Sequence, residues 1–343
     1  MRRRFTSLDL HTSTTSDYER PDRYRQITEA AKRDRIITRG AGVSYAGASF
    51  SENALSIDVS AFNRILAFNN DERWVEVEGA VSLGKLFEFL TPYGLHLAVQ
   101  PGHPQITIGG CIAANVHGKN QYKEGVFGQW VETLKLFHPN HGMITASRTE
   151  NAEIFDLTVG GYGLTGIILS ARLRLEPLPG LTIREDRIKV GGLAEAFREI
   201  DRLKSDYDMI YCWNDLARRG KNIGRGYIVA GKYVTGIDTE KPIAQYKRLN
   251  PSAKKHFRPT IFADCAMPWV NCLYYHQNTR STKPVMVPLF GFLFPAVGKE
   301  FYFDFFGKHG LIELQTLLPS DSIDLYVKDF LKIIRRHEQP VAL

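Results

Sequence analysis

The spacing of apolar and polar positions predicts alternating short strands and amphipathic helices in the first half of the chain. Runs of alternating or β-branched residues bounded by turn residues are typical of strands. Apolar positions three and four apart, ending near proline or glycine, are typical of helices. The predicted elements of this half are strands at 35–38, 55–59, 74–77 and 164–175, and helices at 24–32 and 83–90.

The pattern breaks at residues 177–180, which read PLPG, and a new series of elements follows. We therefore expect two domains, residues 1–180 and residues 181–343. In the second, we predict strands at 209–213 and 311–317, helices at 193–204 and 324–336, and the start of another strand at 341–343. Residues 285–298 are the most apolar stretch, but they contain two prolines and are too short to span a bilayer. We expect them to be a buried segment of the second domain, with contact to a membrane surface as the alternative.

Composition places the chain among ordinary globular proteins. Its 343 residues are 43% hydrophobic and 24% charged, with 44 Lys and Arg against 37 Asp and Glu. The resulting net charge of +7 favours anionic partners, although no nucleic-acid-binding motif accompanies it. The four cysteines form no CxxC pair and have no zinc-site spacing. We therefore expect reduced thiols, no metal, no nucleic-acid partner and a cytoplasmic location.

Three glycine-bearing segments carry the candidate chemistry: residues 39–47 (RGAGVSYAG), 101–120 (PGHPQITIGGCIAANVHGKN) and 160–166 (GGYGLTG). Glycine lets backbone N–H groups approach a phosphate closely. None of the segments matches the GxGxxG or GxxxxGK[ST] fingerprint, which disfavours a Rossmann dehydrogenase or a P-loop enzyme.

The order and spacing of these segments resemble the PCMH-type FAD-binding domain of the vanillyl-alcohol-oxidase superfamily. Within it, the resemblance is closest to the decaprenylphosphoryl-β-D-ribose 2′-oxidase family, and it is strong over residues 25–180. The HGKN and GLTGI elements together carry most of its specificity. The resemblance implies an α+β fold, in which two α/β subdomains bind FAD and a substrate (cap) domain with an antiparallel sheet follows.

The resemblance also implies which residues contact FAD. The first loop is expected to wrap the pyrophosphate, the HGKN residues are expected at the isoalloxazine and substrate end, and one glutamine is expected to reach the flavin from the second domain. The implied residues are Thr38, Arg39, Gly40, Ala41, Gly42, Val43, Ser44, Tyr45, Ala46, Gly47, Ala48, Gly102, Thr107, Ile108, Gly109, Gly110, His117, Gly118, Lys119, Asn120, Ile168 and Gln315. Covalent members carry a histidine where this chain has Val43, so we expect non-covalent FAD.

The implied reaction is oxidation of a secondary hydroxyl on a sugar, phosphorylated or polyprenyl-phosphate-linked, by hydride transfer to flavin N5. Lys119 could stabilise an alkoxide or hold a phosphate, His117 could move a proton, and Tyr45 could touch flavin or substrate. Trp213 and the aromatic residues at 269–275 could line a sugar or lipid pocket, with a core role as the alternative. Glu78 is interpreted as an ordinary strand-end carboxylate.

Two alternatives stay open. One is an aldonolactone oxidase or dehydrogenase on the same fold. The other is a catalytically inactive FAD-binding fragment, because the family continues beyond the position of Leu343 and the cap domain is expected to be incomplete. The resemblance further implies a short-chain reductase acting on the keto product, and peripheral contact with the inner membrane surface.

Overall fold

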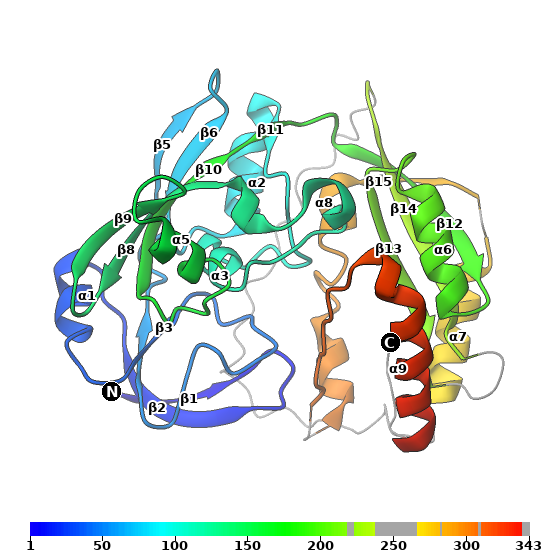
Figure 1. Ribbon diagram of the computed structural model, residues 1–343, viewed down its shortest axis with the longest axis horizontal. Helices are drawn as coiled ribbons and strands as arrows, with labels where there is room; N and C mark the ends of the chain where they lie inside the picture. The colour runs from blue at the N-terminus through cyan, green and yellow to red at the C-terminus, as the bar shows by residue number, and fades with distance from the viewer. Residues whose placement is uncertain (218–222, 237–265, 282, 308–309, 338–343) are drawn as a thin grey trace. The chain divides into compact units, whose positions relative to one another are not determined.

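The computed structural model describes residues 1–217, 223–236, 266–281, 283–307 and 310–337 (Figure 1). The chain divides into two compact units. The first contains Met1–Pro179 and Leu293–Glu300, and the second contains the described residues of Gly180–Glu240, Phe257–Phe292 and Phe301–Leu343. Helices and largely antiparallel sheets occur in both units, so the predicted α+β class is confirmed.

The first unit begins with a four-stranded sheet of order β1-β2-β4-β3. The antiparallel pair β1 (Arg2–Thr6) and β2 (Ser13–Glu19) is followed by α1 (Tyr24–Ala30). The chain then enters β3 (Ile36–Arg39) and β4 (Leu55–Asp58), which run parallel to each other. The predicted helix at 24–32 and the strands at 35–38 and 55–59 are therefore confirmed, each with small shifts at its ends.

A five-stranded antiparallel sheet of order β5-β6-β10-β8-β9 forms the rest of the first unit (Figure 1). Its strands are β5 (Ile65–Asn69), β6 (Trp74–Glu78), β8 (Val131–His138), β9 (Gly142–Ser147) and β10 (Ile167–Arg174). In β6, Val75 and Val77 are fully buried and lie on either side of the less buried Glu76, as the alternation in the sequence predicted. Ile27 of α1, Ile57 of β4 and Leu169 of β10 belong to one apolar core, which joins this sheet to the first one.

Short helices connect the strands of the first unit. Helix α2 (Leu83–Leu90) has the predicted bounds, and its N-cap Ser82 accepts a hydrogen bond from the backbone N–H of Lys85. The helix ends at a 3₁₀ turn that contains Pro92 and closes at Gly94, whose φ of 67° suits glycine. The remaining elements are β7 (Leu95–His96), α3 (Ile108–Ala113), α4 (Gln121–Glu124), η2 (Phe127–Trp130), α5 (Ala152–Thr158) and β11 (Glu176–Pro177).

The second unit is built on an antiparallel sheet of order β13-β14-β12-β15. Helix α6 packs on this sheet and α9 packs against α6, while α7 contacts β13 and β14. The elements are β12 (Thr182–Val190), α6 (Leu193–Leu203), β13 (Met209–Asp215), β14 (Arg225–Val234), α7 (Met267–Thr279), β15 (Val285–Pro288), α8 (Leu289–Leu293), η4 (Glu300–Phe305), η6 (Ser320–Ser322) and α9 (Ile323–His337). The predicted helices at 193–204 and 324–336 and the strand at 209–213 are confirmed.

The strand predicted at 311–317 is wrong. These residues are irregular, and Ile312, Leu314 and Leu317 are largely exposed. Their apolar spacing suits a strand, but no described strand pairs with them, and backbone pairing is what makes a strand. The strand expected at 341–343 lies outside the described residues.

The apolar stretch at 285–298 is divided between exposed and buried positions. Val285 and Met286 of β15 are exposed, whereas Leu289, Phe290 and Phe294 are buried. The expectation of a buried segment therefore holds only for the apolar side chains from Leu289 to Phe294, of which Leu293 and Phe294 belong to the first unit. Over the described residues, no helix combines the length and the apolar character needed to cross a bilayer.

Candidate functional site

The loop that follows β3 is folded around the side chain of Arg39. This guanidinium is buried, donates to Oγ of Ser49 at 2.7 Å, and lies 4.7 Å from the ring centre of Phe5. Gly42 has a φ of 70°, and a Cβ on it would collide with the guanidinium of Arg39. The backbone N–H of Leu8 donates to the carbonyl of Ser44 at 2.9 Å, which ties the loop to the N-terminal strands. The first glycine-bearing segment is thus a packed loop with a fixed path.

Gly40 brings this loop against the second glycine-bearing segment. An ideal Cβ on Gly40 would lie 2.5 Å from Oγ1 of Thr107, a separation that no real Cβ tolerates. Thr107 is the N-cap of α3, and its Oγ1 accepts a hydrogen bond from the backbone N–H of Gly110 at 3.2 Å. The two segments therefore meet at the start of α3.

A second close approach joins α3 to the five-stranded sheet. The backbone N–H of Gly109 donates to the carbonyl of Gly79 at 2.7 Å, and Gly79 itself donates to Leu169 at 2.8 Å. A Cβ on Gly79 would lie 2.5 Å from the carbonyl oxygen of Ile168. Ile168, one of the implied cofactor residues, is thereby placed beside the α3 backbone. Sequence reasoning missed Gly79, whose only signal was a single glycine directly after a predicted strand.

Gly102 and Gly110 are exposed, unlike the glycines that pack against protein. Among the described residues, no atom lies within 4 Å of an ideal Cβ on Gly102. A Cβ on Gly110 would meet Oγ1 of Thr107 at 3.2 Å and Cγ2 of Ile106 at 3.9 Å. These two backbones therefore border open space, as backbones that a cofactor approaches closely should.

The HGKN residues form a turn beyond the end of α3. Nδ2 of Asn120 donates to the carbonyl of Ala98 at 2.7 Å, and a Cβ on Gly118 would lie 2.7 Å from Oδ1 of Asn120. His117 is exposed, with its Nδ1 3.3 Å from the carbonyl oxygen of Gly118. The turn is therefore fixed by Asn120, while the imidazole of His117 stays accessible.

Lys119 is the cation of this turn, and its ammonium is held in a desolvated position. Its Nζ donates to the carbonyl of Leu293 at 2.7 Å, and both residues belong to the first unit. Burial lowers the pKa of Lys119 to about 8, because the charged form loses hydration. At neutral pH the group therefore remains mostly an ammonium, but its proton is unusually easy to remove.

The sequence-predicted site residues lie in the first unit, except Gln315. Tyr45 is exposed on the first loop, so its ring is accessible to a ligand. Gln315 lies in the second unit, where it is exposed and its Nε2 donates to Oε1 of Glu313. A role for Gln315 at the cofactor therefore stays a prediction.

Glu78 is more than the strand-end carboxylate that its position suggested. Its side chain is fully buried and accepts hydrogen bonds from the hydroxyl of Tyr24 and from the backbone and guanidinium of Arg64, with shortest distances of 2.7 Å. Burial alone would raise the pKa of this carboxyl, but the hydrogen bonds outweigh it and the net shift is downward. The residue that follows is Gly79, so this network anchors the backbone that receives α3.

The second unit carries an aromatic and charged cluster on its sheet. The ring of Trp213 lies 5.7 Å from that of Tyr227 and 5.1 Å from that of Tyr274. On β12, which pairs with the strand of Tyr227, Nε of Arg187 donates to Glu185 at 2.7 Å. Stacked rings beside a charged pair can bind a sugar through its apolar and hydroxyl faces. Trp213 is thus half-buried among aromatic rings, and this position is compatible both with a core role and with the wall of a pocket.

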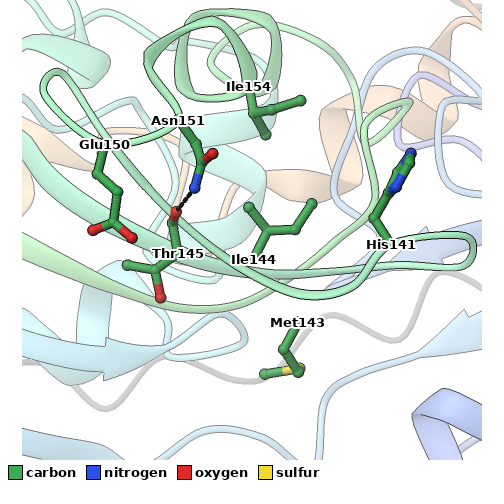
Figure 2. Close-up of a pocket in the computed structure, with 7 residues that line it drawn as sticks. All are labelled: His141, Met143, Ile144, Thr145, Glu150, Asn151 and Ile154. Carbon is green, nitrogen blue, oxygen red and sulfur yellow. Dashed lines mark hydrogen bonds between the residues drawn. The ribbon is translucent and has the colours of Figure 1, made fainter.

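A hollow of about 550 Å³ lies elsewhere, beside the edge strand β9 (Figure 2). None of the sequence-predicted site residues lines it. Within it, Nδ2 of Asn151 donates to the carbonyl of Thr145 at 2.7 Å, so the side chain of Asn151 satisfies one backbone acceptor of β9. The lining residues are His141, Met143, Ile144, Thr145, Glu150, Asn151 and Ile154. The rings of His138 and His141 lie 4.6 Å apart, but no described group of three or more potential ligands could hold a metal ion.

Comparison with known proteins places the first two glycine-bearing segments, residues 39–47 and 101–120, in a described domain. Residues 22–147 match the family described as FAD binding domain. The decaprenylphosphoryl-beta-D-ribose oxidase of Mycolicibacterium smegmatis is 35% identical over 213 residues, which cover 60% of this chain and 46% of that protein. The L-gulonolactone oxidase of Scyliorhinus torazame is 26% identical over 155 residues, covering 45% of this chain and 35% of that protein.

A solved structure shares the fold. An alkyldihydroxyacetonephosphate synthase superposes with a TM-score of 0.53 at 17% identity, over 63% of this chain and 46% of the other. The chain thus spans less than half the length of these relatives. The implied residues that lie in the matched range include the first loop, α3 and the HGKN turn.

Proposed function

We propose that the chain is a PCMH-type FAD-binding protein, that it binds FAD, and that it acts as an FAD-dependent oxidoreductase on a CH–OH group, because residues 22–147 match an FAD binding domain. The residues fit the cofactor. Exposed backbone at Gly102 and Gly110 borders open space, while Gly40 and Gly109 are held in place by protein contacts. The loop around Arg39 would hold the pyrophosphate, and α3 with the HGKN turn would line the rest of the cofactor.

The flavin is proposed to be non-covalent. Val43 of the first loop has no atom that can bond to the flavin. Cys111 of α3 is fully buried, and burial raises the pKa of its thiol, so it offers no accessible thiolate. A covalent link through these two positions is therefore chemically unfavourable.

The proposed substrate is a sugar with a secondary hydroxyl, phosphorylated or joined to a polyprenyl phosphate. Bound FAD would accept the hydride from the carbinol carbon. Lys119 supports this assignment most directly, because a desolvated ammonium stabilises a developing alkoxide or a phosphate more strongly than a hydrated one does. The accessible imidazole of His117 is suited to carrying the hydroxyl proton to solvent. The Mycolicibacterium relative, named for a lipid-linked ribose, supports the same substrate class.

An aldonolactone is the second candidate substrate, supported by the match to L-gulonolactone oxidase. A lactone lacks a phosphate, so the two candidates differ in what they require of Lys119. Loss of its charge should raise the KM for a sugar phosphate more than the KM for a neutral lactone. The keto product of sugar oxidation would in turn need a reductase as the next enzyme.

The proposal is tested by the visible spectrum of the purified chain before and after acid precipitation. A flavin band released into the supernatant supports non-covalent FAD. Colour that stays in the pellet contradicts the non-covalent link, and a colourless chain that takes up no added FAD contradicts the cofactor itself. Anaerobic bleaching of the band by a sugar phosphate, a polyprenyl-linked sugar or an aldonolactone then separates the substrates, and no bleaching by any of them supports an inactive FAD-binding chain.

A further inference from the structure

Helix α7 of the second unit is held to the sheet by polar and aromatic contacts, and its outer side carries large apolar groups. Asn271 is 4% exposed, and its Nδ2 donates to Oδ1 of the fully buried Asp215 at 3.0 Å. Near the other end of the helix, the guanidinium of Arg187 donates to Oδ1 of Asn278 at 3.1 Å. The ring of Tyr274, 5.1 Å from that of Trp213, adds an aromatic contact, so the inner side of this helix is already occupied by contacts with the sheet.

The outer side of α7 carries the largest apolar groups. Trp269 is 80% exposed and Leu273 is 72% exposed. All four tryptophans of the chain lie in described segments, and Trp269 is the one that is exposed. A tryptophan and a leucine one turn apart on an exposed helix are costly in water and are typical of a binding surface.

The same stripe continues into positive charge. The spacing of four, three and four residues from Trp269 through Leu273 and His276 to Arg280 keeps all four on one side of the helical path. Lys283 follows shortly after, and neither it nor Arg280 forms an ion pair with any described residue. No Asp or Glu occurs between Cys265 and Lys299, so nothing in this stretch of sequence neutralises the two cations.

We propose that this outer stripe of α7 docks on an anionic lipid surface. Tryptophan and leucine side chains insert at the boundary between headgroups and acyl chains, and arginine and lysine bind anionic headgroups. Exposed Trp269 and Leu273, together with two cations that pair with no acid of the described chain, fit such a surface in both polarity and charge. A protein partner with an apolar groove would cover Trp269 and Leu273. It would leave the positive charges of Arg280 and Lys283 without a counter-charge, unless the groove also carried acidic residues.

Flotation with lipid vesicles tests the proposal. The purified chain, supplied with FAD, is mixed with vesicles of phosphatidylcholine alone or of phosphatidylcholine with phosphatidylglycerol. We expect it to float with the anionic vesicles, and Trp269→Ser combined with Leu273→Ser to lower the partition coefficient by about tenfold or more. Arg280→Gln combined with Lys283→Gln should abolish the preference for anionic vesicles and the salt dependence of binding. Leu157→Ser is the matched control, because Leu157 is an exposed leucine on α5 of the first unit.

A second measurement places the contact at the stripe itself. Brominated phosphatidylcholine in the vesicles should quench the fluorescence of Trp269, and Trp269→Phe should remove that quenching while keeping an apolar ring. Far-ultraviolet circular dichroism of each variant shows whether it is folded. The vesicles contain no sugar substrate, so failure of the proposed oxidation would leave this result unaffected.

Three results would overturn the proposal. The first is wild-type chain that floats with neither vesicle type. The second is a doubly serine-substituted chain that floats as well as the wild type. The third is a wild-type dimer that dissociates on Trp269→Ser with Leu273→Ser and does not float, which would make the stripe a self-association surface.

Discussion

Replacing Gly110 by valine separates space reserved for a cofactor from space that is simply solvent. Gly110 is the third residue of α3 and is exposed. Its nearest neighbours for an added Cβ are Oγ1 of Thr107 at 3.2 Å and Cγ2 of Ile106 at 3.9 Å, so the protein itself has room for a side chain after a small adjustment. If FAD lies against this backbone, the cofactor is what the valine will meet.

The substitution should barely change the stability of the apoprotein but should weaken FAD binding strongly. In the apoprotein, the higher helix propensity of valine should stabilise α3 by about 0.5 kcal/mol relative to glycine. The tight contact of the added side chain with Thr107 should offset part of this gain. In the FAD complex, overpacking should cost about 1–3 kcal/mol, which weakens FAD binding roughly 5- to 150-fold. The variant should therefore unfold at nearly the wild-type temperature without FAD and bind FAD much less tightly.

The assay is titration of apoprotein with FAD, followed by quenching of flavin fluorescence, beside thermal unfolding of the apoprotein. Gly291→Val is the control, because Gly291 is an exposed helical glycine in α8 with no described atom within 4 Å of an ideal Cβ. That change alters helix propensity but should leave FAD affinity unchanged. A Gly110→Val chain that binds FAD within twofold of wild type would show that α3 has been assigned to the wrong ligand surface.

Two further predictions concern ionisable groups. The pKa of Lys119 falls from 10.5 to about 8 on folding, so the unfolded chain binds more protons than the folded chain between these pH values. The melting temperature of the wild type should therefore rise with pH across this interval relative to that of Lys119→Met. Parallel plots of melting temperature against pH for the two proteins would refute the lowered pKa. Glu78→Gln should cost roughly 2 kcal/mol at pH 7, since it replaces a buried acceptor of hydrogen bonds from Arg64 and Tyr24. The folded pKa of Glu78 is lowered, so this difference should shrink as the pH falls below the ordinary value of 4.5 and be lost below the folded pKa. Urea unfolding at pH 7 and at low pH measures it, and an equal effect at both pH values would count against the carboxylate's role.

Local periodicity was sufficient for the elements whose own sequence decides them. Helix α2 was predicted with its observed bounds because its apolar positions follow a helical pattern that ends at Pro92 and Gly94, and the structure adds the cap at Ser82. The strand at 311–317 failed for the opposite reason. Apolar spacing there is a local property, whereas a strand exists only where another strand supplies hydrogen bonds.

The candidate site divides in the same way. Glycine-bearing segments are visible in the sequence, and their order led to the FAD-binding domain. The contacts that position them come from residues distant in the sequence, such as Gly79 with Gly109 and Tyr24 with Glu78. No local pattern around Glu78 distinguishes a solvated carboxylate from a fully buried one that accepts hydrogen bonds from Tyr24 and Arg64.

Lys119 shows why chemistry, in particular, needs the fold. The HGKN motif identified it as a functional cation, but a lysine in an exposed turn would keep its ordinary pKa and most of its hydration. Its Nζ instead donates to Leu293, which lies 174 residues further along the chain. That distant segment contributes to the burial that brings the pKa to about 8, close enough to neutrality for the same group to stabilise an anion and to release a proton. A chain that kept HGKN but lost the contact with Leu293 should have a Lys119 whose pKa lies closer to the ordinary value of 10.5.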